Sequence, residues 1–396
     1  MVTPARIREA AALLSGKIIR TPLVYSPTFS DATGTEVYLK LETMQKAGSF
    51  KVRGAANRIL SGKEGQGVIA ASAGNHAQGV AVAAGIAGVP VTIVMPEWSS
   101  PGKQEAAAGY GAEILLFGST LQESIGYAME IAEKKRIPFI HPYDDEAVIA
   151  GQGTIGLEIL EDLPDAGVII VPVGGGGLIA GIATAVKSIR PDIRVIGVQA
   201  AACPSAAEAR SAGRPVTVDA GPTLADGIRV TRTGDLTWPV VRDLVEEIVV
   251  VDEDEIVAAI SILLERKKVL AEGAGAAPLA ALLSGSITAY QGEKVVAVIS
   301  GGNLDAFLLE RVLRKGLFDA GRLFRCILDI EEGGRSLPTL ISQIAREGVT
   351  ISRVEQERGS PDLPLHLNRV TVEMELRGPE HRDRIIGVLR ELGYRI

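Results

Sequence analysis

The chain has 396 residues, long enough for two or three domains that each bury a hydrophobic core. Hydrophobic residues make up 46% and charged residues 22%, and 41 Lys and Arg against 48 Asp and Glu give a net charge of −7 without any basic block, a balance that argues against nucleic acid as a partner. The longest apolar runs, such as residues 168–173, have the length of a strand and fall far short of the roughly 20 residues of a membrane-spanning helix.

The N-terminal segment predicts a helix rather than a targeting signal. Thr3 is placed to cap this helix, Pro4 lies in its first turn, and Gly16 ends it. The segment lacks the apolar centre of a signal peptide. The two cysteines, Cys203 and Cys326, and the four histidines have no metal-ligand spacing, so we expect a reduced, cytoplasmic protein without a metal site.

Short β-branched runs alternate with Gly-rich turns and Ala-rich helical segments from residue 37 to about residue 315. These runs predict strands at residues 37–42, 67–72, 91–95, 113–117, 168–173, 195–199, 248–251 and 295–300. Apolar strands separated by helices are typical of an α/β fold whose mainly parallel sheet is covered on both faces. Ligands of such sheets bind beyond the carboxyl ends of the strands, so the junctions between strand and helix are the informative places.

The pattern changes near residues 316–322. From there it predicts strand, helix, strand, strand, helix and a short final strand, at residues 324–330, 337–346, 351–356, 370–376, 380–392 and 394–396. This βαββαβ order is ferredoxin-like, and the segment carries no cluster of polar catalytic residues. We therefore expect a catalytic part over residues 1–320 and a separate domain over residues 324–396.

The first informative junction is a run of four glycines after the strand at residues 168–173. The run consists of Gly174, Gly175, Gly176 and Gly177, and a helix starts near Leu178. Free backbone N–H groups at the positive end of a helix dipole bind anions, and the missing Cβ atoms let a phosphate approach closely. The run also satisfies the loose dinucleotide fingerprint, but that fingerprint requires an acidic residue at the end of the next strand, where this chain has Gln199.

Two further strand ends carry polar side chains. The strand at residues 67–72 runs into Ser72, Ala73, Gly74, Asn75 and His76, and the strand at residues 295–300 runs into Ser300, Gly301, Gly302 and Asn303. Amide and hydroxyl donors at a helix start suit a substrate carboxylate. Taken alone, each junction is more often a simple turn or helix cap.

A lysine adds an amine to these junctions. In "KAGSFKVRGA", residues 46–55, Lys51 lies between Phe50 and Gly54 in a segment that predicts neither a strand nor a solvated helix. Three strand ends on one sheet would then combine an anion cradle, a carboxylate cradle, a neutral hydroxyl and an amine. This set suggests pyridoxal 5′-phosphate, whose aldehyde condenses with a lysine and whose ring withdraws electrons.

The motifs "SFKVRGA", "SAGNHAQG", "GGGGL" and "SGGN", in this order and spacing, resemble those of the threonine/serine dehydratase family of fold-type-II pyridoxal-phosphate enzymes. The motifs "TLADGI" and "EGAGAAPLAALLSG" support the resemblance, which covers residues 1 to about 320. It implies open parallel sheets in two subdomains, with the smaller one, about residues 48–147, inserted in the larger.

The resemblance also implies roles for individual residues. Lys51 would carry the cofactor and Phe50 would pack beside its ring, and we expect burial beside Phe50 to disfavour the charged form of Lys51. Asn75 would bind the 3′-oxygen of the ring, and Ser300 would face the pyridine nitrogen. The phosphate would be bound by Gly174, Gly175, Gly176, Gly177 and Leu178, with Gly227 nearby, and the substrate carboxylate by Ser72, Ala73, Gly74, Asn75 and His76.

The C-terminal segment resembles the ACT regulatory domain, on "AREGVTISRVEQERG" and "VEMELRGPEHRDRIIGVLRELGY". Two positions depart from that family, because "EEGGRSL" replaces a Pro-Gly-x-Leu loop and "GVTI" lacks an Asn that often follows the helix. Binding of an amino-acid effector is therefore an open point. In the catalytic part, Gln199 replaces a carboxylate that helps relatives of the serine racemase type bind a divalent cation, so we predict no metal there.

The implied reaction is the α,β-elimination of water from L-threonine, and also from L-serine, by a homo-oligomer (dimer or tetramer) that binds small amino acids. Serine racemase of the same family is the near alternative, but racemases carry a serine where this chain has Ala73. An ACT-containing NAD-dependent dehydrogenase or an amino-acid sensor without catalysis are alternatives from other classes. The first would have no use for Lys51, and the second would not need three polar strand ends.

Overall fold

The computed structural model describes residues 2–62, 67–289, 291–331, 337–358 and 363–394. The chain divides into two compact units, Met1–Leu304 and Asp305–Ile396. No helix in the described part of the chain is long and apolar enough to cross a bilayer.

A six-stranded sheet forms the centre of the first unit, in the order β1-β2-β9-β6-β7-β8. Its strands are β1 (Leu23–Tyr25), β2 (Glu36–Leu41), β6 (Val168–Pro172), β7 (Arg194–Ala200), β8 (Glu247–Val251) and β9 (Lys294–Ile299). All neighbours are parallel except β1, which pairs antiparallel with β2 and was not predicted from the sequence. The other strands of the unit were predicted to within one residue at each end.

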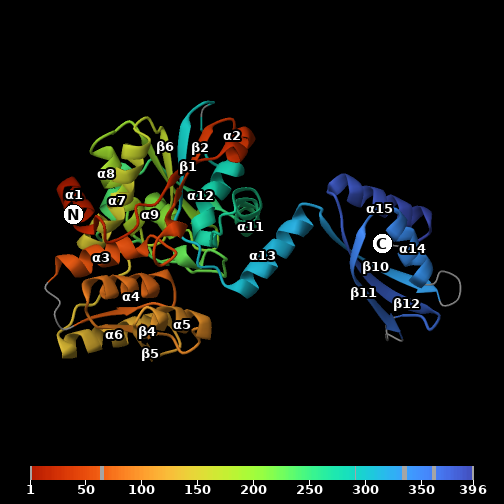
Figure 1. Cartoon of the computed structure of the whole chain (residues 1–396), viewed down its shortest axis with the longest axis horizontal. Helices are drawn as coiled ribbons and strands as arrows, with labels where there is room; N and C mark the ends of the chain where they lie inside the picture. The colour runs from red at the N-terminus through yellow and green to blue at the C-terminus, as the bar shows by residue number, and fades with distance from the viewer. Residues whose placement is uncertain (1, 63–66, 290, 332–336, 359–362, 395–396) are drawn as a thin grey trace. The chain divides into compact units, whose positions relative to one another are not determined.

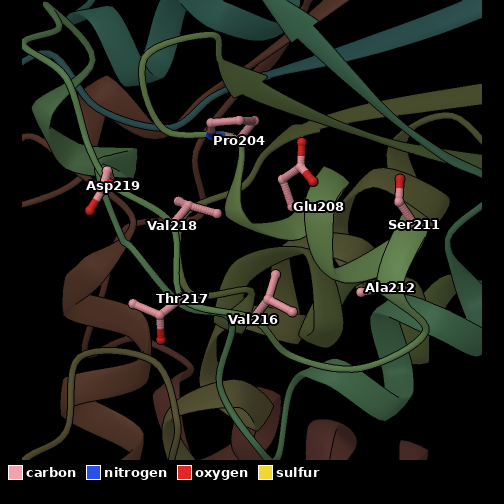
Figure 2. Close-up of a pocket in the computed structure, with 8 residues that line it drawn as sticks. All are labelled: Pro204, Glu208, Ser211, Ala212, Val216, Thr217, Val218 and Asp219. Atoms are coloured by element: carbon pink, nitrogen blue, oxygen red, sulfur yellow. The ribbon is translucent and has the colours of Figure 1, made fainter.

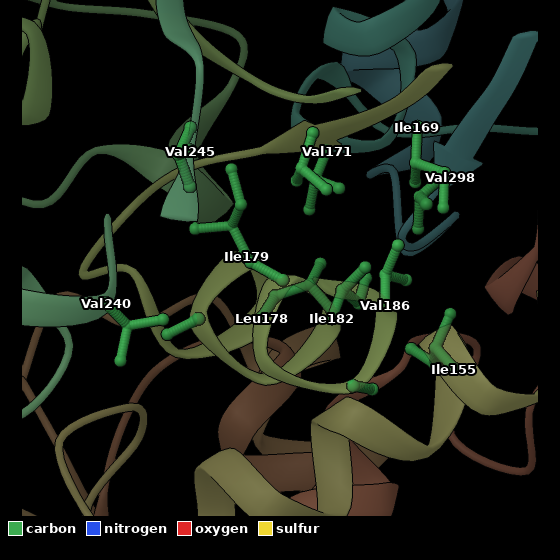
Figure 3. Packing of buried hydrophobic residues seen from close by; sticks show 14 of the residues in the cluster. Ile155, Ile169, Val171, Leu178, Ile179, Ile182, Val186, Val240, Val245 and Val298 are labelled. Carbon is green, nitrogen blue, oxygen red and sulfur yellow. The ribbon is translucent and has the colours of Figure 1, made fainter. Parts of the chain in front are cut away.

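Helices cover both faces of this sheet because successive strand residues point to opposite faces. In β6, Ile169 and Val171 belong to the cluster that includes α8 (Gly177–Lys187). Figure 3 shows this packing, with Leu178, Ile182 and Val186 of the helix directed at Ile169 and Val171 of β6 and Val298 of β9. Figure 1 shows α7 (Glu146–Asp162) beside α8, and α11 (Glu253–Ile262) and α12 (Gly273–Leu283) on the other side of the sheet.

The remaining helices of the larger subdomain lie around this core. They are α1 (Pro4–Leu14), α2 (Pro27–Thr33), η1 (Glu42–Met44), α9 (Ser205–Ala212), η2 (Asp226–Ile228), α10 (Trp238–Leu244) and η3 (Leu263–Lys267). The predicted N-terminal helix is confirmed, since the Thr3 side chain accepts a hydrogen bond from the Arg6 N–H at the start of α1.

A second, smaller sheet has the parallel order β3-β4-β5. It consists of β3 (Val68–Ala71), β4 (Val91–Met95) and β5 (Glu113–Leu116), with α3 (Lys51–Ser61), α4 (Asn75–Ala87), α5 (Pro101–Gly109) and α6 (Leu121–Lys135) around it (Figure 1). The expectation that three polar strand ends lie on one sheet is therefore wrong. The Ser72–His76 junction follows β3 of the smaller sheet, whereas the glycine run and Ser300 follow β6 and β9 of the larger.

The second unit begins with α13 (Ala306–Asp319), which packs on β10. It continues with β10 (Leu323–Glu331), α14 (Leu337–Arg346), β11 (Thr350–Arg358), β12 (Leu367–Glu375) and α15 (Pro379–Glu391). The antiparallel sheet has the order β10-β12-β11. The division falls before α13 and not near residue 320, because that helix packs on the C-terminal sheet. The "EEGGRSL" loop and the end of the predicted final strand lie outside the described residues, apart from Glu331, Leu337 and Tyr394.

Candidate active site

Lys51 is the first residue of α3, directly after Phe50, whose ring centroid lies 5.2 Å from the lysine Nζ. The Lys51 amine donates a hydrogen bond of 2.9 Å to the Pro142 carbonyl oxygen. Burial of the amine lowers the pKa of Lys51 to about 8, while the charge of Glu272 acts in the opposite direction. The expectation that burial disfavours the charged form is confirmed.

The glycine run forms a tight turn between β6 and α8, and neighbouring residues pack closely against its backbone. A Cβ atom at Gly175 would collide with the Tyr143 ring, and one at Gly177 would lie 2.9 Å from the Tyr143 carbonyl oxygen. Gly176 has a φ of +95° and would meet the Thr237 hydroxyl at 2.7 Å. Glycine is therefore required here by close packing and backbone conformation as well as by any ligand.

The same turn offers a set of free donors. Among the described residues, no carbonyl or side chain accepts a hydrogen bond from the backbone N–H groups of residues 174–178. These groups lie at the N-terminus of α8, where the helix dipole favours an anion. The Thr233 hydroxyl nearby is buried and has no partner among the described residues. The turn therefore fits a phosphate group.

The loop between β3 and α4, which was predicted to bind the substrate carboxylate, contains hydrogen bonds of its own. The Ser72 hydroxyl accepts a hydrogen bond of 3.1 Å from the Gly74 N–H, and Asn75 starts α4. The His76 ring is buried, with its Nε2 2.8 Å from the Ile140 carbonyl oxygen. Since a carbonyl only accepts, this nitrogen carries the proton, and burial lowers the pKa of His76 to about 3. The imidazole is thus a neutral group turned toward the core.

The end of β9 lies against the segment that carries Lys51. The Phe50 N–H donates to the Ser300 carbonyl oxygen at 3.0 Å, and Ser49 forms an isolated bridge with Gly301. Ser300 itself is buried. The backbone that carries the predicted cofactor lysine and the strand end that carries Ser300 are therefore held side by side, although they are distant in sequence.

Gly227 lies between the two strand ends. A Cβ atom there would be 3.5 Å from Glu272 Oε1 and 3.9 Å from Asn75 Nδ2. The tertiary structure thus places the glycine run next to Tyr143, Lys51 next to Pro142, and Asn75 near Gly227, whereas the His76 ring is directed at the core.

Sequence reasoning missed Tyr143 and gave no role to two residues of the quoted motifs, Asn303 and Glu272. Tyr143 packs on the glycine run, and Asn303 and Glu272 bind the side chain of Asn75. Glu272 is buried, and burial together with the charge of Asp226 raises the pKa of Glu272 to about 7. The acidic residue in front of the helical run "GAGAAPLAALL" is the signal that could have identified it.

The side chain of Gln199 is hydrogen-bonded at both its oxygen and its nitrogen by neighbouring residues. Its Oε1 accepts from the N–H groups of Ala206 and Ala207, at 2.8 and 3.0 Å, and its Nε2 donates to the Val173 carbonyl oxygen at 3.1 Å. The amide therefore secures the start of α9 directly. Among the described residues, no group of three or more His, Cys, Asp or Glu could bind a metal ion.

A separate pocket opens beside α9 (Figure 2). It is lined by Pro204, Glu208, Ser211, Ala212, Val216, Thr217, Val218 and Asp219. None of the predicted site residues lines this pocket, and it contains no lysine.

Over most of its length the chain is similar to a family model and to known proteins. Residues 14–301 match the family model described as "Pyridoxal-phosphate dependent enzyme". An L-threonine ammonia-lyase of Geobacter sulfurreducens is 46% identical over 391 residues, which cover 98% of this chain and 97% of that protein. The catabolic L-threonine dehydratase TdcB of Escherichia coli K12 is 48% identical over 318 residues, 79% of this chain and 96% of that protein. The structure of maize serine racemase has a TM-score of 0.75 at 37% identity and covers 80% of this chain and 98% of its own.

Proposed function

Because the chain belongs to the family of pyridoxal-phosphate dependent enzymes, we propose that it catalyses the α,β-elimination of water from L-threonine, giving 2-oxobutanoate and ammonia. L-Serine would react in the same way to give pyruvate. The observation that carries the proposal is a buried lysine of lowered pKa beside a turn of free N–H groups, in a chain that is 46% identical, over nearly its full length, to an L-threonine ammonia-lyase.

The residues present fit the cofactor. The N–H groups of residues 174–178 would hold the phosphate, the Asn75 amide the ring oxygen, and the Ser300 hydroxyl the ring nitrogen. When bound, pyridoxal phosphate supplies an aldehyde carbon for an amine and a conjugated ring that accepts electrons from the substrate Cα. A hydroxyl beside the ring nitrogen does not stabilise a positive charge there as a carboxylate would, which favours rapid loss of a β-substituent over reprotonation of Cα.

Lys51 would have two functions at its Nζ atom. In its neutral form the amine attaches the cofactor covalently, and when displaced it can accept the Cα proton of the substrate. Burial lowers the pKa of Lys51 to about 8, so a sizeable neutral fraction exists near neutral pH. The Pro142 carbonyl oxygen, 2.9 Å away, accepts a hydrogen bond from the amine and so holds it next to the segment that carries Tyr143.

The decisive experiment compares two lysines of the same segment. Lys51→Ala should abolish threonine turnover and the visible absorption of the lysine-linked cofactor. Lys46→Ala is the matched control, since Lys46 is exposed and its amine donates to the Lys17 carbonyl oxygen. Turnover that survives in Lys51→Ala, or borohydride trapping of the cofactor on another lysine, would contradict the proposal.

Serine racemase is the second candidate, because the maize enzyme is 37% identical to this chain. Racemisation requires a proton donor on the face of the substrate opposite the lysine. At the position where racemases of the family carry a serine, this chain has Ala73, a side chain without an exchangeable proton. Chiral analysis of unreacted L-serine after partial turnover separates the two reactions, and we expect it to remain L.

For the second unit, residues 305–396, we propose a regulatory domain of the ACT type. Three features support this: the sequence resemblance, the antiparallel sheet β10-β12-β11 with α14 and α15, and a core of its own. The near-complete match of Escherichia coli TdcB to 79% of this chain indicates that the elimination does not need the rest. A homo-oligomer in the cytoplasm and an amino-acid effector are part of this proposal.

A further inference from the structure

Three side chains from different elements form a continuous chain of hydrogen bonds next to Lys51. Asn303, which follows β9, donates from Nδ2 to Asn75 Oδ1 at 2.8 Å. Asn75, at the start of α4, donates from its own Nδ2 to Glu272 Oε1 at 2.6 Å. Glu272 lies directly before α12. The chain therefore links both sheets of the first unit through Asn75.

The direction of this chain is set at both ends. Asn303 Nδ2 also donates to the Ala47 carbonyl oxygen at 2.8 Å, and a carbonyl can only accept. Both protons of Asn303 Nδ2 are thus used, and the atom of Asn75 that faces Asn303 must be its oxygen. The nitrogen of Asn75 then faces Glu272, which offers acceptor oxygens. One N–H of Asn75 is committed to Glu272, and the described contacts leave the second one available.

Neighbouring glycines keep both ends of the chain in place. Gly48 has a φ of +67°, and a Cβ atom there would collide with Asn303 Oδ1. A Cβ atom at Gly301 would lie 2.5 Å from Glu272 Oε1. The backbone therefore leaves room for these two side chains in the conformations they adopt, and for little else.

Burial of the Glu272 carboxyl destabilises the folded protein. Glu272 is only 4% exposed, and among the described residues no Lys, Arg or His forms an ion pair with it. A buried carboxyl without a cation destabilises a protein, and hydrophobic replacements of similar size are often tolerated better. Its hydrogen bond with Asn75 is the contact that such a replacement would lose.

We propose that Glu272 and Asn303 are positioning residues that fix the amide of Asn75, so that its second N–H is the one offered to the cofactor. This inference rests on the proposed function, in which Asn75 binds the ring oxygen. An asparagine free to rotate would also present its oxygen, which cannot donate to an oxygen of the cofactor. An acceptor at Glu272 also polarises the amide and strengthens its remaining N–H as a donor.

The test is a double-mutant cycle on cofactor affinity, measured by titrating the full-length apoprotein with pyridoxal phosphate and following the visible absorption. Asn75→Ala and Glu272→Leu should each weaken binding by about tenfold, as expected for loss of one hydrogen bond. The double variant should bind no more than about twofold more weakly than Asn75→Ala alone, because Glu272 acts only through Asn75. Glu272→Gln retains an acceptor oxygen and should lose less affinity than Glu272→Leu.

Asn303→Leu tests the same chain of hydrogen bonds from its other end. It replaces Glu272→Leu if that variant does not fold. It should weaken binding in the wild-type background and have no further effect in Asn75→Ala. Gln45→Met is the matched control, because Gln45 is also a buried amide but bonds Ile19 and Lys46 instead. It should lower thermal stability and leave cofactor affinity unchanged.

The experiment separates failure of this inference from failure of the proposed function. Losses that add fully in the double variants, or a Glu272→Leu protein that binds the cofactor as tightly as wild type, would overturn the inference alone. A wild-type apoprotein that does not bind pyridoxal phosphate would instead overturn the proposed function.

Discussion

Lys51 and Glu272 are two titratable groups whose charged forms are both disfavoured by burial. Burial lowers the pKa of Lys51 to about 8 and raises the pKa of Glu272 to about 7. The charge of each partly offsets the effect of burial on the other. Both groups therefore exchange protons near neutral pH, where a surface lysine and a surface glutamate would be fully charged.

This pair predicts the pH dependence of cofactor attachment. Only the neutral amine of Lys51 attacks the aldehyde, so the attachment rate should rise with pH up to the pKa of about 8 and then level off. The charge of Glu272 raises the pKa of Lys51, so Glu272→Gln should move the midpoint to lower pH. Rapid mixing of apoprotein with pyridoxal phosphate at a series of pH values measures this.

A small primary amine in place of the protein provides the control, because it reports the titration of pyridoxal phosphate itself. A rate without pH dependence near 8, or a midpoint that moves to higher pH in Glu272→Gln, would contradict this assignment.

Arg53 lies two residues after Lys51 and is fully buried. Its guanidinium donates to Glu42 at 2.8 Å and to Glu158 at 2.6 Å, and Lys40 also pairs with Glu158 at 2.6 Å. Two cations thus face two carboxylates with no net charge. The network joins the first turn of α3 to the end of β2 and to α7, and so holds the backbone of Lys51 in position.

Arg53→Met should destabilise the protein by about 3–5 kcal/mol, because it leaves buried carboxylates without their partner. Arg58→Met is the matched control on the same helix. Arg58 is one-quarter exposed and pairs with Asp145, so its loss should cost less than about 1 kcal/mol. Denaturant unfolding measures the free energy of unfolding of both variants. Equal losses would show that the buried network stabilises the protein no more than the partly exposed Arg58–Asp145 pair does.

At the scale of elements, the loop between β3 and α4 is shaped by its own hydrogen bonds and by packing on α3. A Cβ atom at Gly79 of α4 would lie 2.9 Å from the Cβ atom of Lys51, so the two helices touch beside the lysine. Ala73 lies in the loop that precedes α4 and is partly exposed. Because Ala73 is not buried, the slightly larger serine side chain can be accommodated there.

Ala73→Ser should therefore add measurable racemisation of L-serine while elimination continues. The serine hydroxyl supplies the proton donor that the wild-type loop lacks. Chiral chromatography of residual serine measures D-serine in both proteins, and Ala73→Gly controls for the effect of changing the loop. Wild-type racemisation as fast as elimination would refute this interpretation of Ala73.

At the scale of the whole molecule, each unit has its own core. In the second unit β10 alternates, with Cys326, Leu328 and Ile330 buried, while Arg325 and Ile327 are exposed. The buried side chains pack with residues of α14, α15 and β12, including Leu340, Val372 and Ile385. A separate core is the property of a unit that can fold and bind ligands independently.

Truncation after Ala320, which keeps α13 but removes the sheet β10-β12-β11 with α14 and α15, should leave cofactor binding and threonine turnover intact and abolish any response to branched-chain amino acids. A regulatory domain affects catalysis only through differential binding to two states, and this coupling is lost with the domain. Titration of isoleucine and valine against the full-length and truncated proteins measures the effect. A truncated protein that binds the cofactor but does not turn over threonine would show that the second unit contributes to catalysis.

Much of the site could be predicted from the sequence because its chemistry depends on local features. Lys51 follows a Gly-Ser-Phe turn, and the glycine run follows a buried strand, so residue type and immediate neighbours were enough to mark both as candidates, while their roles came from the family resemblance. The order of the motifs along the chain then pointed to the family, and the strand boundaries followed from the spacing of apolar residues.

Other features were decided only by the tertiary structure. Asn75 bonds Glu272 and Asn303 across 197 and 228 positions, and no local pattern reports which distant side chains share one hydrogen bond. The inward turn of His76 depends on the carbonyl of Ile140, and the need for glycine at position 175 depends on the Tyr143 ring. Sequence by itself determined which groups are available, because residue types and periodicity are local properties. Which of them meet, and in which protonation state, was decided by the fold, since burial and hydrogen bonding depend on neighbours that are remote in the chain.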